Sequence, residues 1–273
     1  MLKIKKMTQP NELSDLKTAY FNASTGPLDG MWHFGFAPMA QHFGFYESEV
    51  LVGFCCINSE KYLLQFYLSE IANTLPSELF TLIINNESKT VGEVKGAFAS
   101  TAEPQYLSLC MDGSTAHSVN ALMYQHCEDK IVREAEEIEL ILASYDQLNS
   151  LVDFAFEAID APKEWLTSYY TRLISRDELW YWAINGSIVA TGECRLFDEH
   201  QTQFADLGMI VSTEHRRQGI ATRVLEQLVM IAKRKGLNAI CSTESGNIGA
   251  QKAIHKAGFK ALNRIVQFDF SHR

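Results

Sequence analysis

Two arginines and a glycine stand directly before an amphipathic run, at residues 214–228, in a chain that is acidic overall. Ile220, Val224 and Leu228 recur at helical spacing, which predicts a helix that begins near Gly219. The first N–H groups of a helix have no intrahelical partner, and the helix dipole adds partial positive charge there. Glycine lets a ligand approach the backbone closely. These residue types therefore indicate a site for an anion such as a phosphate group.

A structural alternative explains the same residues without a ligand. Gly219 is then an ordinary turn glycine, and Arg216 and Arg217 solvate the surface, because short glycine motifs often match by chance. Two other phosphate-binding patterns are excluded. The sequence contains no G-x-G-x-x-G after a strand and no G-K-[ST] loop.

The context of the loop favours the anion site. The stretch Arg216-x-x-Gly219-x-Ala221 follows a predicted antiparallel strand, and it resembles the pyrophosphate loop of the GNAT acyltransferase superfamily, which reads Arg or Gln, two residues, Gly, one residue, Gly or Ala. Residues 247–259 resemble the final helix motif of that superfamily, with Asn247, Ala250, Gly258 and Phe259 in the expected places. The resemblance covers nearly all of residues 138–270.

The resemblance implies an acyl-CoA site with acetyl-CoA as the donor and no metal. The pantetheine arm would pair like an extra strand with residues 209–211, and a backbone N–H near Met209 or Ile210 would polarise the thioester carbonyl. The pyrophosphate would lie on backbone N–H groups of residues 217–222. The residues expected to bind the co-substrate are Met209, Ile210, Val211, Arg216, Arg217, Gln218, Gly219, Ile220, Ala221, Thr222, Asn247 and Ala250.

Acyl transfer to an amine needs help with a proton. A lysine-like amine with a pKa of about 10.4 is mostly protonated at neutral pH, so a carboxylate base is useful, whereas a thiol with a pKa near 8.5 leaves with little help. The first candidate is Glu193, because a carboxylate among apolar strand residues is costly unless it faces a polar cavity; an ion pair with Arg195 is the alternative. Asp206 lies one position from where many members carry a catalytic Glu, so it is expected to face the other side. Glu244 is the third candidate.

The general acid is where the chain departs from the superfamily pattern. Many members carry a tyrosine on the last helix, and Ile254 stands at that position here. The adjacent His255 is the alternative acid, but it lies about 100° away around the helix, which favours a surface position.

The elements around these residues predict an α+β fold with a mixed sheet. Asn185-Gly186 joins two apolar runs, the strongest short hairpin pattern, and residues 202–212 add a third strand. Helices are predicted before this meander at residues 146–159 and 162–174, and Gly236 is placed to end the helix that follows it. A strand over 237–243, a helix over 247–257 and a final strand over 263–270 complete a GNAT-like order.

The N-terminal half repeats this order faintly, with a strand, a helix over residues 11–21, a hairpin turning at residues 47–49 and another strand. The charged seam at residues 128–137 predicts two tandem domains, 1–134 and 135–273. Since the first half has no matching Arg-x-x-Gly loop, it is expected to be a degenerate GNAT-like copy or an accessory domain that covers the acceptor side.

Composition narrows the class of protein. The 273 residues carry a formal net charge of −9, which argues against a nucleic-acid partner. No apolar run is long enough for a membrane span and no signal peptide is evident, so a cytoplasmic location is expected. The six cysteines lack metal-ligand spacing and indicate reduced core residues.

The sequence therefore predicts an N-acetyltransferase that moves an acetyl group from acetyl-CoA to a primary amine on a small molecule or peptide. A non-catalytic acyl-CoA-binding sensor or regulatory protein is the alternative, favoured by the missing tyrosine. A homodimer is one of the assembly states left open, as is the identity of the acceptor.

Overall fold

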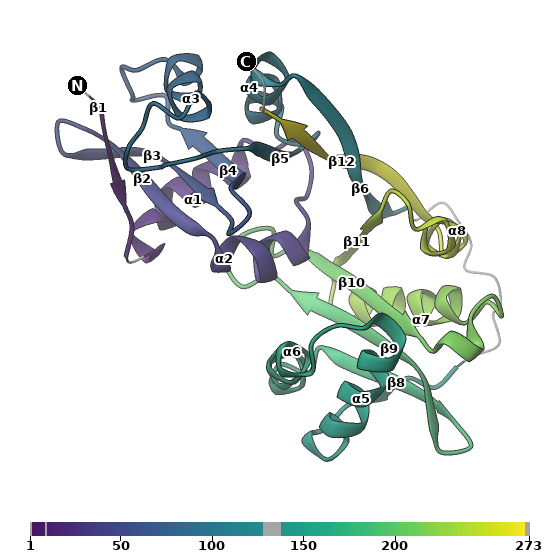
Figure 1. Cartoon of the computed structure of the whole chain (residues 1–273). Helices are drawn as coiled ribbons and strands as arrows, with labels where there is room; N and C mark the ends of the chain where they lie inside the picture. The colour runs from purple at the N-terminus through teal and green to yellow at the C-terminus, as the bar shows by residue number, and fades with distance from the viewer. Residues whose placement is uncertain (1, 9, 128–137, 271–273) are drawn as a thin grey trace. The chain divides into compact units, whose positions relative to one another are not determined.

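The chain forms two compact units in the computed structural model, which describes residues 2–8, 10–127 and 138–270 (Figure 1). One unit comprises Met1–Leu122 with Asn263–Arg273, and we call it the N-unit; the other comprises Met123–Leu262, the C-unit. The predicted boundary between residues 134 and 135 lies outside the described residues.

The C-unit is built on an antiparallel meander of β8 (Leu179–Ile184), β9 (Ser187–Leu196) and β10 (Phe204–Val211). The turn between β8 and β9 places Asn185 and Gly186 at φ of 52° and 81°, the left-handed pair that a two-residue hairpin requires. The predicted hairpin and third strand are confirmed. A short strand, β7 (Ile141–Leu142), pairs antiparallel with β8.

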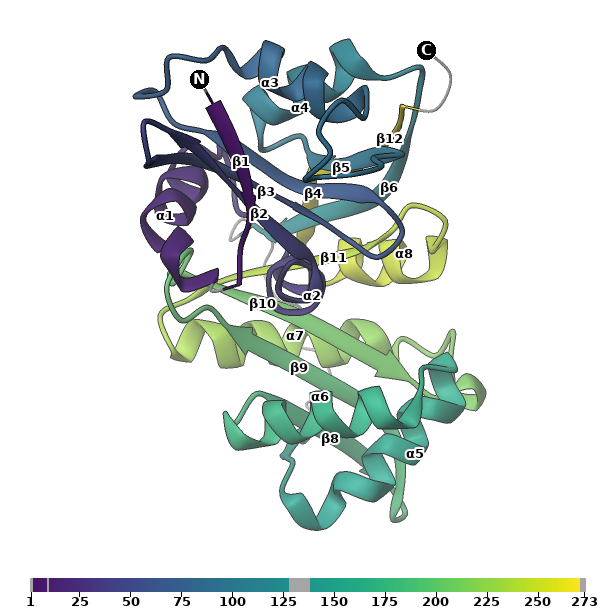
Figure 2. The ribbon, with the colours of Figure 1, turned by 60° about the vertical axis from the view of Figure 1, so that its left-hand side comes forward.

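Helices cover both faces of this meander (Figure 2). α5 (Leu148–Ile159) and α6 (Lys163–Ser175) lie on one face, and α7 (Ile220–Arg234) lies on the other. Successive side chains of β9 point alternately to these two faces of the sheet. Gly192 faces α7, since a Cβ there would lie 3.1 Å from Val224, while the next residue along β9 faces α6.

The C-unit sheet opens beside the second half of β10. β11 (Asn238–Glu244) runs parallel to β10, but their ladder covers only Phe204 to Asp206 and ends there. The backbone of β10 beyond that point pairs only with β9 along the described ladders. Such an opening leaves backbone N–H and C=O groups available to an extended ligand. α8 (Ile248–Lys256) follows β11.

The N-unit has the same plan. β2 (Gln41–Glu47), β3 (Val50–Ile57) and β4 (Tyr62–Leu68) form a meander, and the parallel ladder from β4 to β5 (Gly96–Ser100) stops after Leu63. The remaining elements of the N-unit are β1 (Leu2–Lys6), η1 (Pro10–Leu13), α1 (Ser14–Asn22), η2 (Trp32–Phe36), α2 (Ala37–Met39), α3 (Pro76–Ile84) and α4 (Pro104–Gly113). The core beside α3 and α4 is rich in buried Phe, Leu and Ile, and α1 packs on a second cluster around Phe54.

Two long strands, β6 (Ala116–His126) and β12 (Phe259–Asp269), have residues in both units. In the N-unit, β12 pairs antiparallel with β5 over Ile265 to Asp269, so the end of the chain completes the N-unit sheet. The short η3 (Tyr145–Gln147) and η4 (Thr213–His215) precede α5 and α7. No helix in the described part of the chain is long and apolar enough to cross a membrane.

Candidate functional site

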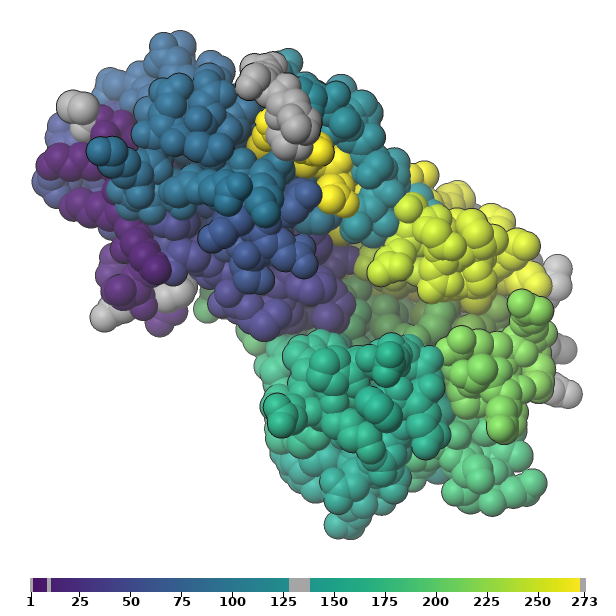
Figure 3. Space-filling model, viewed as in Figure 1, coloured from purple at the N-terminus to yellow at the C-terminus, as the bar shows by residue number. Residues whose placement is uncertain are grey.

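A cavity of about 500 Å³ lies between the end of β10, the loop before α7, and α8. Figure 3 shows α8 (yellow) and this loop (green) beside each other on one face of the C-unit. Eleven of the twelve residues predicted to bind a co-substrate line the cavity, all except Gln218. The side-chain amide of Gln218 donates to the Glu214 carbonyl, so this residue holds the loop rather than facing the cavity.

The backbone of residues 216–222 is shaped to receive an anion. Arg217 and Gly219 have φ of 65° and 80°, the left-handed region in which glycine is favoured. Nothing lies within 4 Å of the place where a Cβ at Gly219 would stand, so the glycine faces open space. No side chain caps the start of α7, which leaves the first N–H groups of that helix and its positive dipole end to a ligand.

The two side chains that flank the loop's N–H groups have structural partners. Arg216 donates from Nη2 to the Ala158 carbonyl and from Nε to the Val211 carbonyl, and thereby ties the loop to α5 and β10. The Thr222 hydroxyl donates to the Ala253 carbonyl on α8. The loop is therefore fixed by side chains while its backbone stays available.

α8 forms the other wall of the cavity. Its N-cap, Asn247, accepts from the backbone N–H of Ala250 through its side-chain oxygen. Lys252 and Lys256, one helical turn apart, also line the cavity, although neither was among the residues predicted from the sequence. Four cationic side chains and no carboxylate line this space, which suits a polyanion. The other lining residues missed were Ile159, His215, Gly249 and Ala253.

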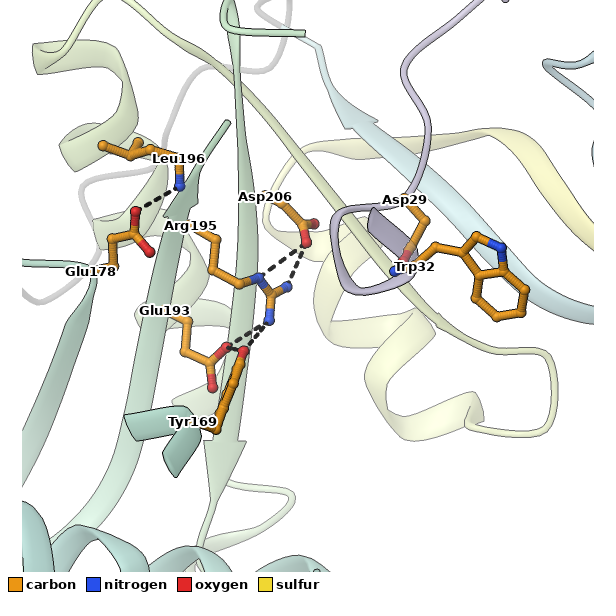
Figure 4. Close-up of polar contacts among 8 residues, drawn as sticks. All are labelled: Asp29, Trp32, Tyr169, Glu178, Glu193, Arg195, Leu196 and Asp206. Atoms are coloured by element: carbon orange, nitrogen blue, oxygen red, sulfur yellow. Dashed lines mark hydrogen bonds and ion pairs between the residues drawn. The ribbon is translucent and has the colours of Figure 1, made fainter. Parts of the chain in front are cut away.

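Two of the three candidate bases meet on one arginine (Figure 4). Arg195 donates from Nη1 to Glu193 at 2.6 Å and from Nη2 to Asp206 at 2.7 Å. Tyr169, on α6, donates its hydroxyl to Glu193 Oε2 at 2.6 Å and accepts from Arg195 Nη1 at 2.8 Å. Asp206 therefore faces the same side as Glu193, and the expectation that it faces the other side is wrong, because the β9–β10 register sets it opposite Arg195.

The charged side chains of this network are buried, so they interact strongly with one another. Glu193, Arg195 and Asp206 are each at most 6% exposed. Burial disfavours the charged guanidinium, but the adjacent carboxylates, Asp206 foremost, raise the pKa of Arg195 well above its ordinary value. Burial also raises the pKa of Tyr169 well above its usual range, so its hydroxyl stays protonated and donates.

The network lies at the start of the opening in the sheet. A Cβ on Gly208 would stand 3.0 Å from Glu193 Oε2 and 3.2 Å from Arg195 Nη1, so both groups lie over bare backbone. Gly208 is followed directly by Met209, the first residue of β10 that lines the cavity. Glu193 and Asp206 do not line the cavity themselves, and Gly208, which lies beside Glu193, is the residue before its first β10 lining residue.

The remaining candidates lie apart from this network. Glu244 is exposed at the end of β11, where its backbone carbonyl accepts from the Asn247 N–H. Ile254 is 2% exposed and fills the core beneath α8, while His255 points outward. Neither position supplies an acid near the cavity.

Family models match both halves of the chain. An acetyltransferase (GNAT) domain model matches residues 9–127, and the acetyltransferase (GNAT) family model matches residues 145–259. The N-terminal half is therefore a domain of this family in its own right, and the expectation of a degenerate copy is corrected. A comparison with curated proteins finds no match.

Solved structures agree with the family models. An acetyltransferase from the GNAT family of Colwellia psychrerythraea is 53% identical, with a TM-score of 0.95 over 98% of this chain and all of that one. A tandem GNAT protein from the clavulanic acid biosynthesis pathway is 12% identical and covers 100% of both chains with a TM-score of 0.65. A GCN5-related N-acetyltransferase from Sphaerobacter thermophilus is 13% identical, with a TM-score of 0.66 over 97% of this chain and 94% of that one, and these last two share the fold.

Proposed function

The chain belongs to the GNAT acetyltransferase family and is an acyltransferase, and from this premise we propose that its C-unit moves an acetyl group from acetyl-CoA to a primary amine. The proposal rests on one observation: a free helix start and a free strand edge both line the same cavity. The uncapped start of α7 offers N–H groups to the pyrophosphate, and the unpaired side of residues 209–211 offers a strand edge to the pantetheine arm.

Four cations around the cavity match the charge of the CoA phosphates. Arg217, Lys252 and Lys256 form no ion pair with any residue in the described ranges, so their charges are available to a ligand. Electrostatic attraction between these groups and the phosphates weakens as salt concentration rises.

The N–H groups at Met209 and Ile210 would polarise the thioester carbonyl, because that side of β10 has no strand partner. An amine that attacks this carbonyl must lose a proton. Glu193 is the proposed proton acceptor, acting directly or through a water molecule. Both described hydrogen bonds of its carboxylate go to Oε2, so Oε1 is the atom we assign to the proton.

Arg195 has a positioning role in this proposal. Its charge-assisted bonds hold Glu193 over Gly208, and the same guanidinium is fixed on its other side by Asp206. Ile254 occupies the tyrosine position, so no acid is assigned there, and a thiol with a pKa of about 8.5 leaves as a thiolate with little help.

The experiment is an amine panel with release of free CoA thiol as the readout and gain of one acetyl group on the amine as confirmation. The wild type is expected to turn over with at least one cationic amine, and Glu193→Gln is expected to lower kcat by about 10²-fold or more while acetyl-CoA affinity stays the same. The matched control is Glu244→Gln, which changes an exposed carboxylate outside the buried network. Equal losses in both variants would contradict the assignment of Glu193.

A further inference from the structure

The N-unit carries a carboxylate at the place where the C-unit has its anion-binding loop. The two places correspond because β4 and β10 each pair antiparallel with the strand before them and parallel, for a few residues only, with the strand after the next helix. In the N-unit, residues 69–75 link β4 to α3; in the C-unit, residues 212–219 link β10 to α7. The loops therefore occupy equivalent positions in the two units.

Glu47 accepts four hydrogen bonds from the N-unit loop. Its Oε2 accepts from the backbone N–H and the side-chain amide of Asn73, both at 2.8 Å. Its Oε1 accepts from the backbone N–H of Thr74 at 2.9 Å and from the Thr74 hydroxyl at 2.6 Å. These four donors, led by the Thr74 hydroxyl, lower the pKa of Glu47 to about 2, so the carboxylate is ionised at any ordinary pH.

The position of Glu47 in its hairpin has a direct counterpart in the C-unit. Glu47 pairs with Val50 across the β2–β3 turn, as Ile184 pairs with Ser187 across the β8–β9 turn. Residues 182–189 contain no carboxylate, so the C-unit hairpin has no group that could fill its own loop. The acidic group and the loop that binds it are paired only in the N-unit.

The N-unit loop also lacks the features of the C-unit loop that suit the polyanionic end of CoA. α3 begins with Pro76, which has no N–H to donate. None of the described positive-φ positions falls within residues 69–76, whereas Arg217 and Gly219 provide two in the C-unit. Residues 69–78 contain no Lys or Arg and include Glu70 and Glu78, so this segment has no cation to balance the several charges of CoA.

We propose that Glu47 permanently occupies the anion site of the N-unit, so that each chain binds a single acyl-CoA, in the C-unit. The part of this inference that concerns CoA rests on the proposed function. The part that concerns the N-unit is independent of it: the loop at residues 73–74 is an anion site, and its occupant is supplied by the chain itself.

The first experiment asks whether a free anion can replace the Glu47 carboxylate in the N-unit loop. Glu47→Ala removes the carboxylate and leaves the donors of Asn73 and Thr74 facing a vacated space. The matched control is Glu49→Ala, which removes a carboxylate two residues away that bonds Lys3 and Lys5 instead. Inorganic phosphate is expected to raise the melting temperature of Glu47→Ala by at least ~2 °C more than that of Glu49→Ala, since a ligand of the folded state stabilises it by mass action. Phosphate binding at the C-unit loop is common to both variants and cancels.

Equal phosphate responses in the two variants would overturn the proposal. Glu47→Gln provides a second comparison, because the amide keeps one acceptor oxygen and fills the space; it is expected to lose stability and to show no added phosphate response. A phosphate response of Glu47→Gln as large as that of Glu47→Ala would count against an enclosed site.

Binding stoichiometry tests the consequence without relying on any N-unit variant. Acetyl-CoA is expected to bind the wild type at one molecule per chain. Two molecules per chain would overturn the single-site inference and leave the proposed function intact. No binding at all would instead overturn the proposed function, while the phosphate experiment would still decide whether Glu47 fills an anion site.

Discussion

Buried carboxylates in the two units are stabilised in different ways. Glu193 and Asp206 share a guanidinium, whereas the described hydrogen bonds to the Glu103 carboxylate in the N-unit come from neutral donors, the Tyr20 hydroxyl and the Ser100 N–H. Burial raises the pKa of Glu103 to about 7 from 4.5, because those donors do not offset the loss of water. The sequence singled out Glu193 from its apolar neighbours, and Arg195 two residues on was its expected alternative partner.

Tyr169 could not be found from the sequence in the same way. Its hydroxyl reaches Glu193 only because α6 packs across β9, and that contact joins residues 24 positions apart. The side of the sheet to which Asp206 points depends on the β9–β10 register, and a shift of one residue in that register would place it on the other side. Side chains that depend on packing between elements are therefore the ones that the sequence left open.

Glu103 predicts a pH dependence of stability. Its folded pKa is above its unfolded value, so its contribution is fully present below about pH 4.5 and is lost as the pH rises to about 7. Glu103→Gln cannot ionise, and its free energy of unfolding relative to the wild type is expected to rise between pH 5 and pH 8 by up to ~3 kcal/mol. Urea unfolding at the two pH values measures this change. A difference that does not vary with pH, or one that matches exposed Glu93→Gln, would contradict the prediction.

At the scale of elements, the two ends of α7 have different roles. Its N-terminus faces the cavity through Gly219, and its C-terminus carries Lys233 and Arg234, which complement the dipole there. Both features were predictable because they are local: a glycine before an apolar period of 3.6 and cations in the last turn. The contribution of α8 was predictable only in part, since the sequence predicted a helix over residues 247–257 but not which helical face meets the cavity.

The lysines of α8 give a prediction of their own. Replacing Lys252 and Lys256 with Gln is expected to weaken acetyl-CoA binding about tenfold and to reduce its dependence on salt, because two charges near the phosphates are removed. Titration calorimetry at low and moderate salt provides the measurement. Lys233→Gln is the control, as this exposed lysine lies at the far end of α7 and does not line the cavity. Unchanged affinity in the double variant would show that α8 does not contact the co-substrate.

At the scale of the whole molecule, the last strand, β12, contributes to the sheet of the N-unit. The sequence predicts a final strand over residues 263–270, and the structure confirms it as part of β12. It assigns that strand to the C-terminal domain, however, whereas residues 265–269 pair with β5 of the N-unit. Strand alternation is the same whichever sheet receives the strand, so the destination depends on long-range pairing that local pattern does not encode.

This pairing predicts that a substitution near the C-terminus destabilises the N-unit. Phe268 is 1% exposed and packs in the N-unit core. Phe268→Ala is expected to lower the free energy of unfolding by about 3–5 kcal/mol because it leaves a cavity. Leu262→Ala, on the same strand but 57% exposed, is the control and is expected to cost less than ~0.5 kcal/mol. Equal effects in a denaturant titration would show that the last strand is not part of that core.

The central claim is that the uncapped loop before α7 holds the pyrophosphate of acetyl-CoA. Calorimetric titration of acetyl-CoA into the wild type, Gly219→Glu and Gly236→Glu tests it most directly. The two glycines have similar left-handed φ, 80° and 73°, and open space around them, but only Gly219 lines the cavity. Binding by the wild type and Gly236→Glu that is abolished in Gly219→Glu is the predicted result. Binding that survives in Gly219→Glu, or that is absent from the wild type, would contradict it.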